Sequence, residues 1–292
     1  MKEIEGAGVA LVTPFHEDGK VDYATLERLI DYQIESGIDY LVSLGTTGET
    51  ATLTPEERTE IWNFTSKSVN KRIPLVAGIG GNNTAETTRQ IQQFDTLDYC
   101  AILSVSPYYN KPTQEGIYQH YKALCQASPL PLILYNVPGR TGGNISAQTS
   151  VRLARDFSQV VATKEASGNF SQFSEILRDA PEDFMLISGD DPVTLPMMAL
   201  GAAGIISVVG NAYPEKVSTL TRLCRANNYV DARKIHQELL HLIDLCFTEG
   251  NPAGVKYMLE KKGFGTAHLR LPLTPISDAT KKTIDAAMEK LV

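Results

Sequence analysis

Short apolar runs rich in β-branched residues recur along the chain, and they alternate with stretches that show helical periodicity. Most of these runs lack the alternation of a half-exposed sheet, and near-continuous apolar runs are typical of strands covered on both faces. Eight runs are expected to form strands: Val9–Thr13, Tyr40–Leu44, Pro74–Ile79, Tyr99–Val105, Leu132–Tyr135, Val160–Lys164, Phe184–Ser188 and Gly204–Val208. Their starts lie roughly 20 to 35 residues apart, which leaves room for a helix after each strand.

The stretches between these runs have the features of amphipathic helices. Apolar residues in the segment Leu26–Ile34 recur with the i, i+3, i+4, i+8 spacing of one buried helix stripe. The segment Thr54–Glu57 predicts a helix start, because threonine suits the N-cap, proline the first turn and glutamate the capping box. About eight strand–helix units that close on themselves form a (β/α)8 barrel, whose usual size is about 250 residues. We therefore expect an α/β chain folded as a TIM barrel.

An open, doubly wound sheet is the competing architecture. Such a sheet usually carries a G-x-G-x-x-G nucleotide motif after its first strand, whereas the first strand here is followed by Thr13–Phe15. The one similar stretch, Gly78–Asn83, follows the third strand, and we interpret it as a strand-to-helix turn.

The chain is long enough to contain more than a barrel. After residue 214 the pattern is only helical, and no linker or low-complexity tract marks a boundary. We expect a catalytic (β/α)8 barrel over residues 1–225 and a dependent C-terminal helical extension over residues 226–292.

Charge limits the classes of partner. Lys and Arg number 27 against 34 Asp and Glu, so the formal net charge is −7. Nucleic acids and anionic membranes demand a basic face, so neither is expected as a partner. A small anionic substrate needs only a local cation. The four cysteines form no C-x-x-C pair, which is typical of free thiols in a reducing compartment.

Targeting and membrane segments are not expected. The N-terminus lacks the apolar core of a secretory signal. The segment Pro192–Pro214 has no charged residue, but it contains prolines and glycines and has acidic flanks, so we interpret it as a buried helix and strand. A cytoplasmic enzyme is the expectation.

Lys164 is the strongest candidate for a catalytic residue in the sequence. In a (β/α)8 barrel the active site forms at the carboxyl ends of the strands, and Lys164 ends the sixth predicted strand. It is the only lysine in any predicted strand, where a charged ammonium is costly. Desolvation favours the neutral amine, which can form a Schiff base with a ketone or an aldehyde. The alternative is that Lys164 reaches solvent or pairs with Glu165.

Other strand ends carry groups that could assist. Tyr135 could exchange protons as a general acid or base, or it could simply pack at the barrel rim. Thr46 and Thr47 lie in a glycine-flanked turn whose hydroxyls and N–H groups could bind a carboxylate. Arg140 lies in a loop, either exposed to solvent or placed to grip a second carboxylate with its guanidinium fork.

Neither a metal nor an organic cofactor is expected. The five histidines form no H-E-x-x-H motif. Asp190 and Asp191 could hold Mg²⁺, but a loop acidic pair is far commoner. No G-x-S-x-G nucleophile elbow appears, which weakens an acyl-transfer interpretation.

Taken together, these segments resemble the pyruvate-dependent, lysine-type aldolases, and within them the dihydrodipicolinate synthase family. The resemblance rests on Gly45–Glu49 (GTTGE), Pro107–Pro112 (PYYNKP), Tyr135–Gly142 (YNVPGRTG) and Lys164–Gly168 (KEASG). It runs from Gly6 to the C-terminus with the motifs in order. It implies condensation of pyruvate with L-aspartate 4-semialdehyde, in lysine and diaminopimelate biosynthesis, with no cofactor.

The resemblance also implies a role for each site residue. Lys164 would carry the pyruvate Schiff base, Arg140 would bind the carboxylate of L-aspartate 4-semialdehyde, and the subunits would form a homotetramer. The residues that would hold the pyruvate carboxylate are Thr47 and the backbone near Gly189 and Ile206. The proton relay would comprise Tyr135, Thr46 and Tyr109, with Tyr109 donated by a neighbouring subunit.

Two alternatives of different kinds stay open at this point. One is a related lyase that cleaves N-acetylneuraminate or a 2-keto-3-deoxy sugar acid to pyruvate. The carboxylate clamp expected of Arg140 argues against it, because a sugar-cleaving site needs hydroxyl partners there. The other is a barrel that binds pyruvate without turning it over. Lys164, Tyr135 and Thr46 are all present, which argues against this second alternative.

The resemblance further implies an L-lysine pocket at a subunit interface. The matching positions in this chain are Thr50, Ala51, Arg58, Asn82, Glu86 and Tyr108. Lysine-sensitive relatives commonly carry histidine where this chain has Arg58. A guanidinium near a cationic ligand repels it, so we expect weak sensitivity to L-lysine. The alternative is that Arg58 grips the carboxylate of the ligand instead.

Overall fold

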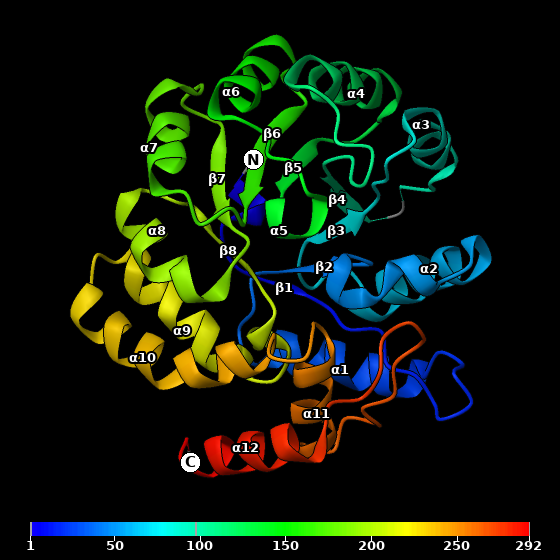
Figure 1. Ribbon diagram of the computed structural model, residues 1–292, viewed down its shortest axis with the longest axis vertical. Helices are drawn as coiled ribbons and strands as arrows, with labels where there is room; N and C mark the ends of the chain where they lie inside the picture. Colours follow the sequence, from blue (N-terminus) through cyan, green and yellow to red (C-terminus); the bar gives the residue numbers. More distant parts are fainter. Residues whose placement is uncertain (1, 97, 292) are drawn as a thin grey trace.

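The structure of the protein is a computed structural model, which describes residues 2–96 and 98–291. Within these residues eight parallel strands close into a barrel in sequence order, with β1 hydrogen-bonded to β8 (Figure 1). The strands are β1 (Gly6–Ala10), β2 (Tyr40–Ser43), β3 (Leu75–Gly78), β4 (Tyr99–Val105), β5 (Leu132–Asn136), β6 (Val160–Glu165), β7 (Met185–Ser188) and β8 (Gly204–Ser207). The predicted TIM barrel is confirmed.

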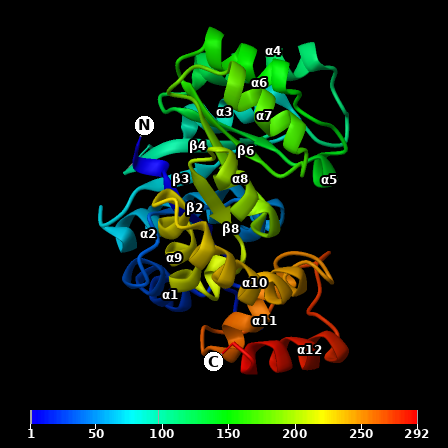
Figure 2. The same ribbon diagram turned by 90° about the vertical axis from the view of Figure 1, so that its left-hand side faces the viewer.

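Helices cover the outside of the barrel, and three more follow it at one end of the molecule (Figures 1 and 2). They are α1 (Tyr23–Glu35), α2 (Pro55–Val69), α3 (Thr84–Gln93), α4 (Gln114–Ala127), α5 (Pro138–Thr141), α6 (Ala147–Asp156), α7 (Phe170–Asp179), α8 (Thr194–Leu200), α9 (Pro214–Arg225), α10 (Tyr229–Leu245), α11 (Ala253–Lys261) and α12 (Asp278–Glu289). None of the helices in the described part of the chain is long and apolar enough to cross a membrane.

Five short 3-10 helices complete the described chain. They are η1 (Lys2–Ile4), η2 (Thr46–Gly48), η3 (Thr50–Thr52), η4 (Asp191–Val193) and η5 (Val209–Asn211). Two of them, η2 and η3, form the connection between β2 and α2. The start of α2 has the predicted capping box: Thr54 Oγ1 accepts from the Glu57 N–H at 3.2 Å, and Glu57 Oε2 accepts from the Thr54 N–H at 2.9 Å.

The first strand lies three residues earlier than predicted, at Gly6–Ala10 instead of Val9–Thr13. Its glycines, Gly6 and Gly8, lie before the apolar run that the prediction relied on. Gly8 is required because a Cβ there would lie 2.3 Å from the ring of Tyr40, which fills the barrel interior at this level. The Tyr40 hydroxyl donates to the carbonyl of Ile205 at 3.1 Å, so the ring is fixed in that position.

Two hydrophobic layers hold the barrel together. Inward-pointing side chains form the interior cluster, which includes Val42, Val76, Leu103, Ile133, Tyr135, Ile187 and Ile206. The second cluster lies between strands and helices, and it runs continuously from Ala7 in β1 to Ile284 in α12. The C-terminal helices therefore share one core with the barrel. The division into residues 1–225 and 226–292 stays a prediction, and α9 ends at that boundary.

Candidate active site

Lys164 lies inside the barrel mouth, near the end of β6. Its side chain is 5% exposed, and its register partners are Tyr135 on β5 and Ile187 on β7. The Nζ atom lies 4.2 Å from the centroid of the Tyr135 ring. A buried ammonium in this position is costly, and the electron-rich face of an aromatic ring offsets part of that cost.

Glu165 does not pair with Lys164. Consecutive strand residues point to opposite faces, so Glu165 faces away from the barrel interior. Its Oε1 accepts from Asn136 Nδ2 at 2.9 Å and from Gln172 Nε2 at 2.8 Å. Burial raises the pKa of this carboxyl group. The alternative in which Lys164 reaches solvent or pairs with Glu165 therefore does not match the structure.

The ends of β7 and β8 make room for Lys164. A Cβ on Gly189 would lie 2.9 Å from Lys164 Cγ, so a larger residue would displace the lysine. The Gly189 N–H donates to the Glu165 carbonyl at 2.7 Å, which closes this part of the wall. Ile206 on β8 is buried in the interior cluster. Burial raises the pKa of Asp190, and the nearby charge of Lys164 opposes that increase.

The two threonines after β2 are held differently. Thr47 is buried, and its Oγ1 accepts a hydrogen bond from Asn251 Nδ2 at 3.0 Å. Its own hydroxyl hydrogen is therefore free to donate. Thr46 is half-buried and lines the cavity described next.

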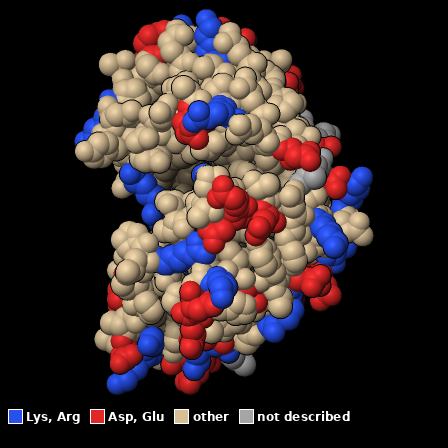
Figure 3. All heavy atoms as spheres, turned by 90° about the vertical axis from the view of Figure 1, so that its right-hand side faces the viewer, with Lys and Arg blue, Asp and Glu red and all other residues tan. Residues whose placement is uncertain are grey.

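A cavity of about 390 Å³ opens at the carboxyl ends of the strands. It brings together residues from the segments after β2, β3, β4 and β5 and from the C-terminal region. Its lining includes Thr46, Tyr135 and Arg140 from the predicted active site, and Thr50, Ala51, Arg58 and Tyr108 from the predicted regulatory site. Figure 3 shows a notch in the edge of the molecule, with Lys or Arg side chains at its rim.

Arg140 lies at the mouth of this cavity. It belongs to the single-turn helix α5, which begins three residues after Tyr135 in the chain. The residue is exposed, and its side chain has no ion pair with another part of the described chain. The turn itself is fixed, because Thr141 Oγ1 donates to the Gly143 carbonyl at 2.8 Å and the Ile145 N–H donates to Asn136 Oδ1 at 2.9 Å. A free guanidinium on a fixed turn is suited to bind an anionic ligand.

Tyr109 lies outside the cavity of its own chain. Its side chain is 89% exposed, and its φ of 71° is in the left-handed region, which is uncommon for a residue with a side chain. The structure thus does not bring Tyr109 together with Tyr135 and Thr46 within one chain. That position leaves the aromatic side chain available to a neighbouring molecule.

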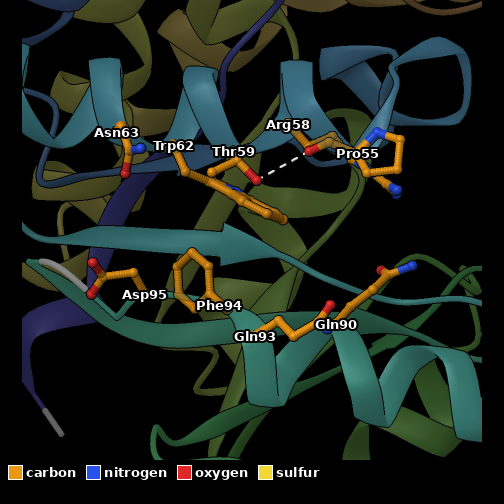
Figure 4. Close-up of a pocket in the computed structure, with 9 residues that line it drawn as sticks. All are labelled: Pro55, Arg58, Thr59, Trp62, Asn63, Gln90, Gln93, Phe94 and Asp95. Carbon is orange, nitrogen blue, oxygen red and sulfur yellow. Dashed lines mark hydrogen bonds between the residues drawn. The ribbon is translucent and has the colours of Figure 1, made fainter.

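The predicted regulatory residues do not form one pocket in the single chain. Asn82 donates from Nδ2 to the Tyr108 carbonyl at 3.1 Å, and Glu86 forms an ion pair with Arg89. Among the described residues, neither Asn82 nor Glu86 lines the 390 Å³ cavity. A second cavity of about 240 Å³ lies between α2 and α3 (Figure 4). Arg58 lines both cavities.

Asp190 and Asp191, which could have held Mg²⁺ together, have different surroundings. Asp191 is buried, and its carboxylate accepts from the Ser207 hydroxyl and from the Val208 N–H, which ties η4 to the end of β8. In residues 2–96 and 98–291 no group of three or more His, Cys, Asp or Glu side chains is arranged to hold a metal ion.

Two residues near the site, Asn251 and Lys256, were not singled out from the sequence. Asn251 binds Thr47, although 204 positions separate them in the chain. Lys256 forms a buried ion pair with Glu49, the last residue of the GTTGE segment. The available signals were weak: a lysine within an apolar helix stretch, and an asparagine before a proline.

The fold and the site define a class of protein: a (β/α)8 barrel with a buried lysine and a neighbouring tyrosine at its mouth, as in the Schiff-base-forming aldolases. Residues 3–291 match the Dihydrodipicolinate synthetase family. The chain belongs to this family.

Individual relatives match along nearly the whole chain. A protein of Parabacteroides distasonis named 4-hydroxy-tetrahydrodipicolinate synthase is 51% identical over 290 residues, which are 99% of this chain and 97% of that protein. The crystal structure of dihydrodipicolinate synthase from Aquifex aeolicus has a TM-score of 0.95 and 41% identity, and the match covers 98% of both chains. The Acinetobacter baumannii enzyme, solved in complex with pyruvate, has a TM-score of 0.96 and 40% identity, covering 99% of both chains.

Proposed function

We propose that Lys164 is the Schiff-base residue of this enzyme. The chain is a 4-hydroxy-tetrahydrodipicolinate synthase: it condenses pyruvate with L-aspartate 4-semialdehyde in lysine and diaminopimelate biosynthesis. The observation that carries the proposal is the buried amine of Lys164, 4.2 Å from the Tyr135 ring and without an ion pair in the described chain. An amine kept from water is suited to attack a carbonyl carbon.

The chemistry follows from that amine. The Lys164 nitrogen attacks the keto carbon of pyruvate, and loss of water leaves an imine. The imine makes the pyruvate methyl group acidic, and loss of a proton gives the enamine. The enamine carbon attacks the aldehyde carbon of L-aspartate 4-semialdehyde and forms the new carbon–carbon bond. The amino group of that substrate then displaces Lys164, which closes the ring and releases the free lysine.

Each of these steps needs a proton carrier. We assign this role to Tyr135, Thr46 and Tyr109, with Tyr109 supplied by a neighbouring subunit. Tyr135 and Thr46 line the same cavity, which supports their part in one relay. The exposure of Tyr109 supports its donation to another chain. General acid–base groups of this kind contribute about 10²- to 10⁴-fold to a rate.

The two substrate carboxylates are bound at different places in this proposal. Thr47 and the backbone near Gly189 and Ile206 hold the pyruvate carboxylate next to Lys164. The hydrogen bond that Thr47 accepts from Asn251 supports this role, because it leaves the Thr47 hydroxyl hydrogen for an anion. Arg140 at the cavity mouth binds the carboxylate of L-aspartate 4-semialdehyde.

The proposal extends to assembly and location. A relay that borrows Tyr109 requires at least a dimer, and we propose a homotetramer built as a dimer of dimers. We place the enzyme in the cytoplasm, where its small-molecule substrates are metabolites.

A coupled assay tests the proposed function directly. The purified chain, supplied with pyruvate and L-aspartate 4-semialdehyde, should turn both substrates over. It should not release pyruvate from N-acetylneuraminate at a comparable rate. Efficient cleavage of the sugar acid, with no condensation, would contradict the proposal.

A further inference from the structure

Glu49 is buried in the middle of the loop between β2 and α2, the loop that carries Thr46 and Thr47. Its side chain has 0% exposure and forms an ion pair with Lys256 of α11, while its Oε2 accepts the backbone N–H of Arg270 at 3.2 Å. Its backbone has a φ of 54° and a ψ of 34°, in the left-handed region. A residue with a side chain adopts this region at an energetic cost, and the surrounding structure must maintain it.

Lys256 is equally removed from water. Its side chain is 2% exposed, its ammonium lies 4.3 Å from the centroid of the Phe15 ring, and it also donates to the His268 carbonyl at 2.9 Å. Burial lowers the pKa of Lys256 to about 8, and the charge of Glu49 opposes that decrease. A buried ion pair is seldom more stabilising than apolar side chains of the same size. A gain in stability therefore does not explain this pair, and its geometry next to the loop does.

Other contacts from the C-terminal region reach the same loop. Asn251, two residues before α11, donates to the Thr47 hydroxyl at 3.0 Å. Arg270 donates to the Thr52 carbonyl at 3.0 Å and to Glu57 of α2 at 2.7 Å. Figure 1 shows this C-terminal segment, drawn in orange to red, running back toward α2. The loop between β2 and α2 is thus held by the C-terminal region at Thr47, Glu49 and Thr52.

We propose that Glu49 and Lys256 are positioning residues, which hold Thr46 and Thr47 where the substrate needs them. The inference rests on the roles proposed above for these two threonines. The ion pair fixes the middle of the loop, directly after η2, and the Asn251 hydrogen bond fixes the orientation of the Thr47 hydroxyl. A hydroxyl that shifts by about 1 Å can cost up to about a hundredfold in rate.

The test separates positioning from stability. Glu49→Gln and Lys256→Met each leave one buried charge unpaired, so each should lower Tm. The double variant Glu49→Gln/Lys256→Met has no buried charge at this place and keeps an acceptor for the Arg270 N–H. It should therefore recover most of the Tm, yet keep a kcat lowered about tenfold to a hundredfold and a raised KM for pyruvate. The matched control is Glu238→Gln/Lys216→Met, an exposed pair that joins α9 and α10, which should leave both constants unchanged.

A more conservative variant, Glu49→Asp, keeps the inference testable if the double variant does not fold. Glu49→Asp keeps the charge but withdraws the carboxylate by one methylene, so it should lower kcat with little change in Tm. Parental kcat and KM in a double variant with recovered Tm, or in Glu49→Asp, would overturn the inference. Borohydride trapping of pyruvate in the parent distinguishes the two proposals: absence of a Lys164 adduct there contradicts the proposed function, whatever the Glu49 variants do.

Discussion

Tyr135 and Lys164 are register partners on β5 and β6, and the Lys164 Nζ lies 4.2 Å from the centroid of the Tyr135 ring. Register partners on neighbouring parallel strands point to the same face, which here is the barrel interior. The amine and its closest aromatic neighbour are therefore fixed by strand pairing rather than by a loop. Rigid placement on strands holds a reactive group more accurately than placement on loops does.

Arg140→Ala tests the second substrate site. The change should leave imine formation on Lys164 intact and raise the KM for L-aspartate 4-semialdehyde. Because a hydrogen bond to a charged group contributes about 1.5–3 kcal/mol, we expect an increase of roughly ten- to a hundredfold. Steady-state kinetics with each substrate varied in turn provides the measurement. Arg233→Ala, an exposed arginine on α10, is the matched control, and unchanged kinetics in Arg140→Ala would remove Arg140 from the site.

Mixing inactive subunits tests whether Tyr109 acts across an interface. Tyr109→Phe and Lys164→Ala should each be inactive or nearly so, for different reasons. A mixed assembly can pair the intact Lys164 of one chain with the intact Tyr109 of another, so mixing should restore part of the activity. No recovery, when exchange of subunits is demonstrated by mass, would mean that Tyr109 does not complete a neighbour's site.

Sensitivity to L-lysine should be weak. Arg58 lines the cavity near the predicted regulatory residues, and Glu86 is paired with Arg89, so an ammonium group must compete with Arg89 for its carboxylate. Arg58→His should increase inhibition, because it removes a fixed positive charge next to a cationic ligand. Inhibition curves for both proteins give the comparison. Half-inhibition of the parent well below about 1 mM lysine, a binding free energy stronger than about −4 kcal/mol, would contradict this prediction.

Acid should destabilise the protein through His120. This side chain on α4 is 3% exposed, and burial lowers its pKa from 6.5 to about 4. Between these values the unfolded chain binds a proton that the folded chain does not, so stability falls as the pH falls from 6.5 to 4. The difference corresponds to roughly 3 kcal/mol at the acid end.

Replacing His120 provides the measurement. His120→Gln should show a smaller loss in the free energy of unfolding between pH 7 and pH 4.5 than the parent, when both are denatured with urea at one protein concentration. His241→Gln, on the exposed side of α10, serves as the control. An identical pH dependence in parent and His120→Gln would show that other groups cause the acid sensitivity.

Local sequence patterns predicted much of the fold. The strand Tyr99–Val105 has the predicted bounds, and the Thr54–Glu57 segment has the predicted cap, because both depend on neighbours in the chain. The first strand was misplaced, because Gly8 is needed to leave space for the ring of Tyr40 and no local pattern shows that need. Spacing alone could also place Lys164 at a strand end, the level of the barrel at which chemistry is expected.

The supporting contacts of the site could not be predicted in the same way. Asn251 and Thr47 lie 204 positions apart, and the pair of Glu49 and Lys256 joins two segments with no shared periodicity. Such contacts depend on how the C-terminal helices pack against the barrel. Only the folded chain shows that they converge on the loop that carries Thr46 and Thr47.

The central claim is that Lys164 carries the covalent intermediate. Borohydride reduction in the presence of pyruvate, followed by peptide mass spectrometry, measures it most directly. The account predicts a pyruvate-derived mass on the peptide that contains Lys164 and none in Lys164→Ala, with the buried Lys256 unmodified in both. A stable adduct on another lysine, or no adduct at saturating pyruvate, would contradict it.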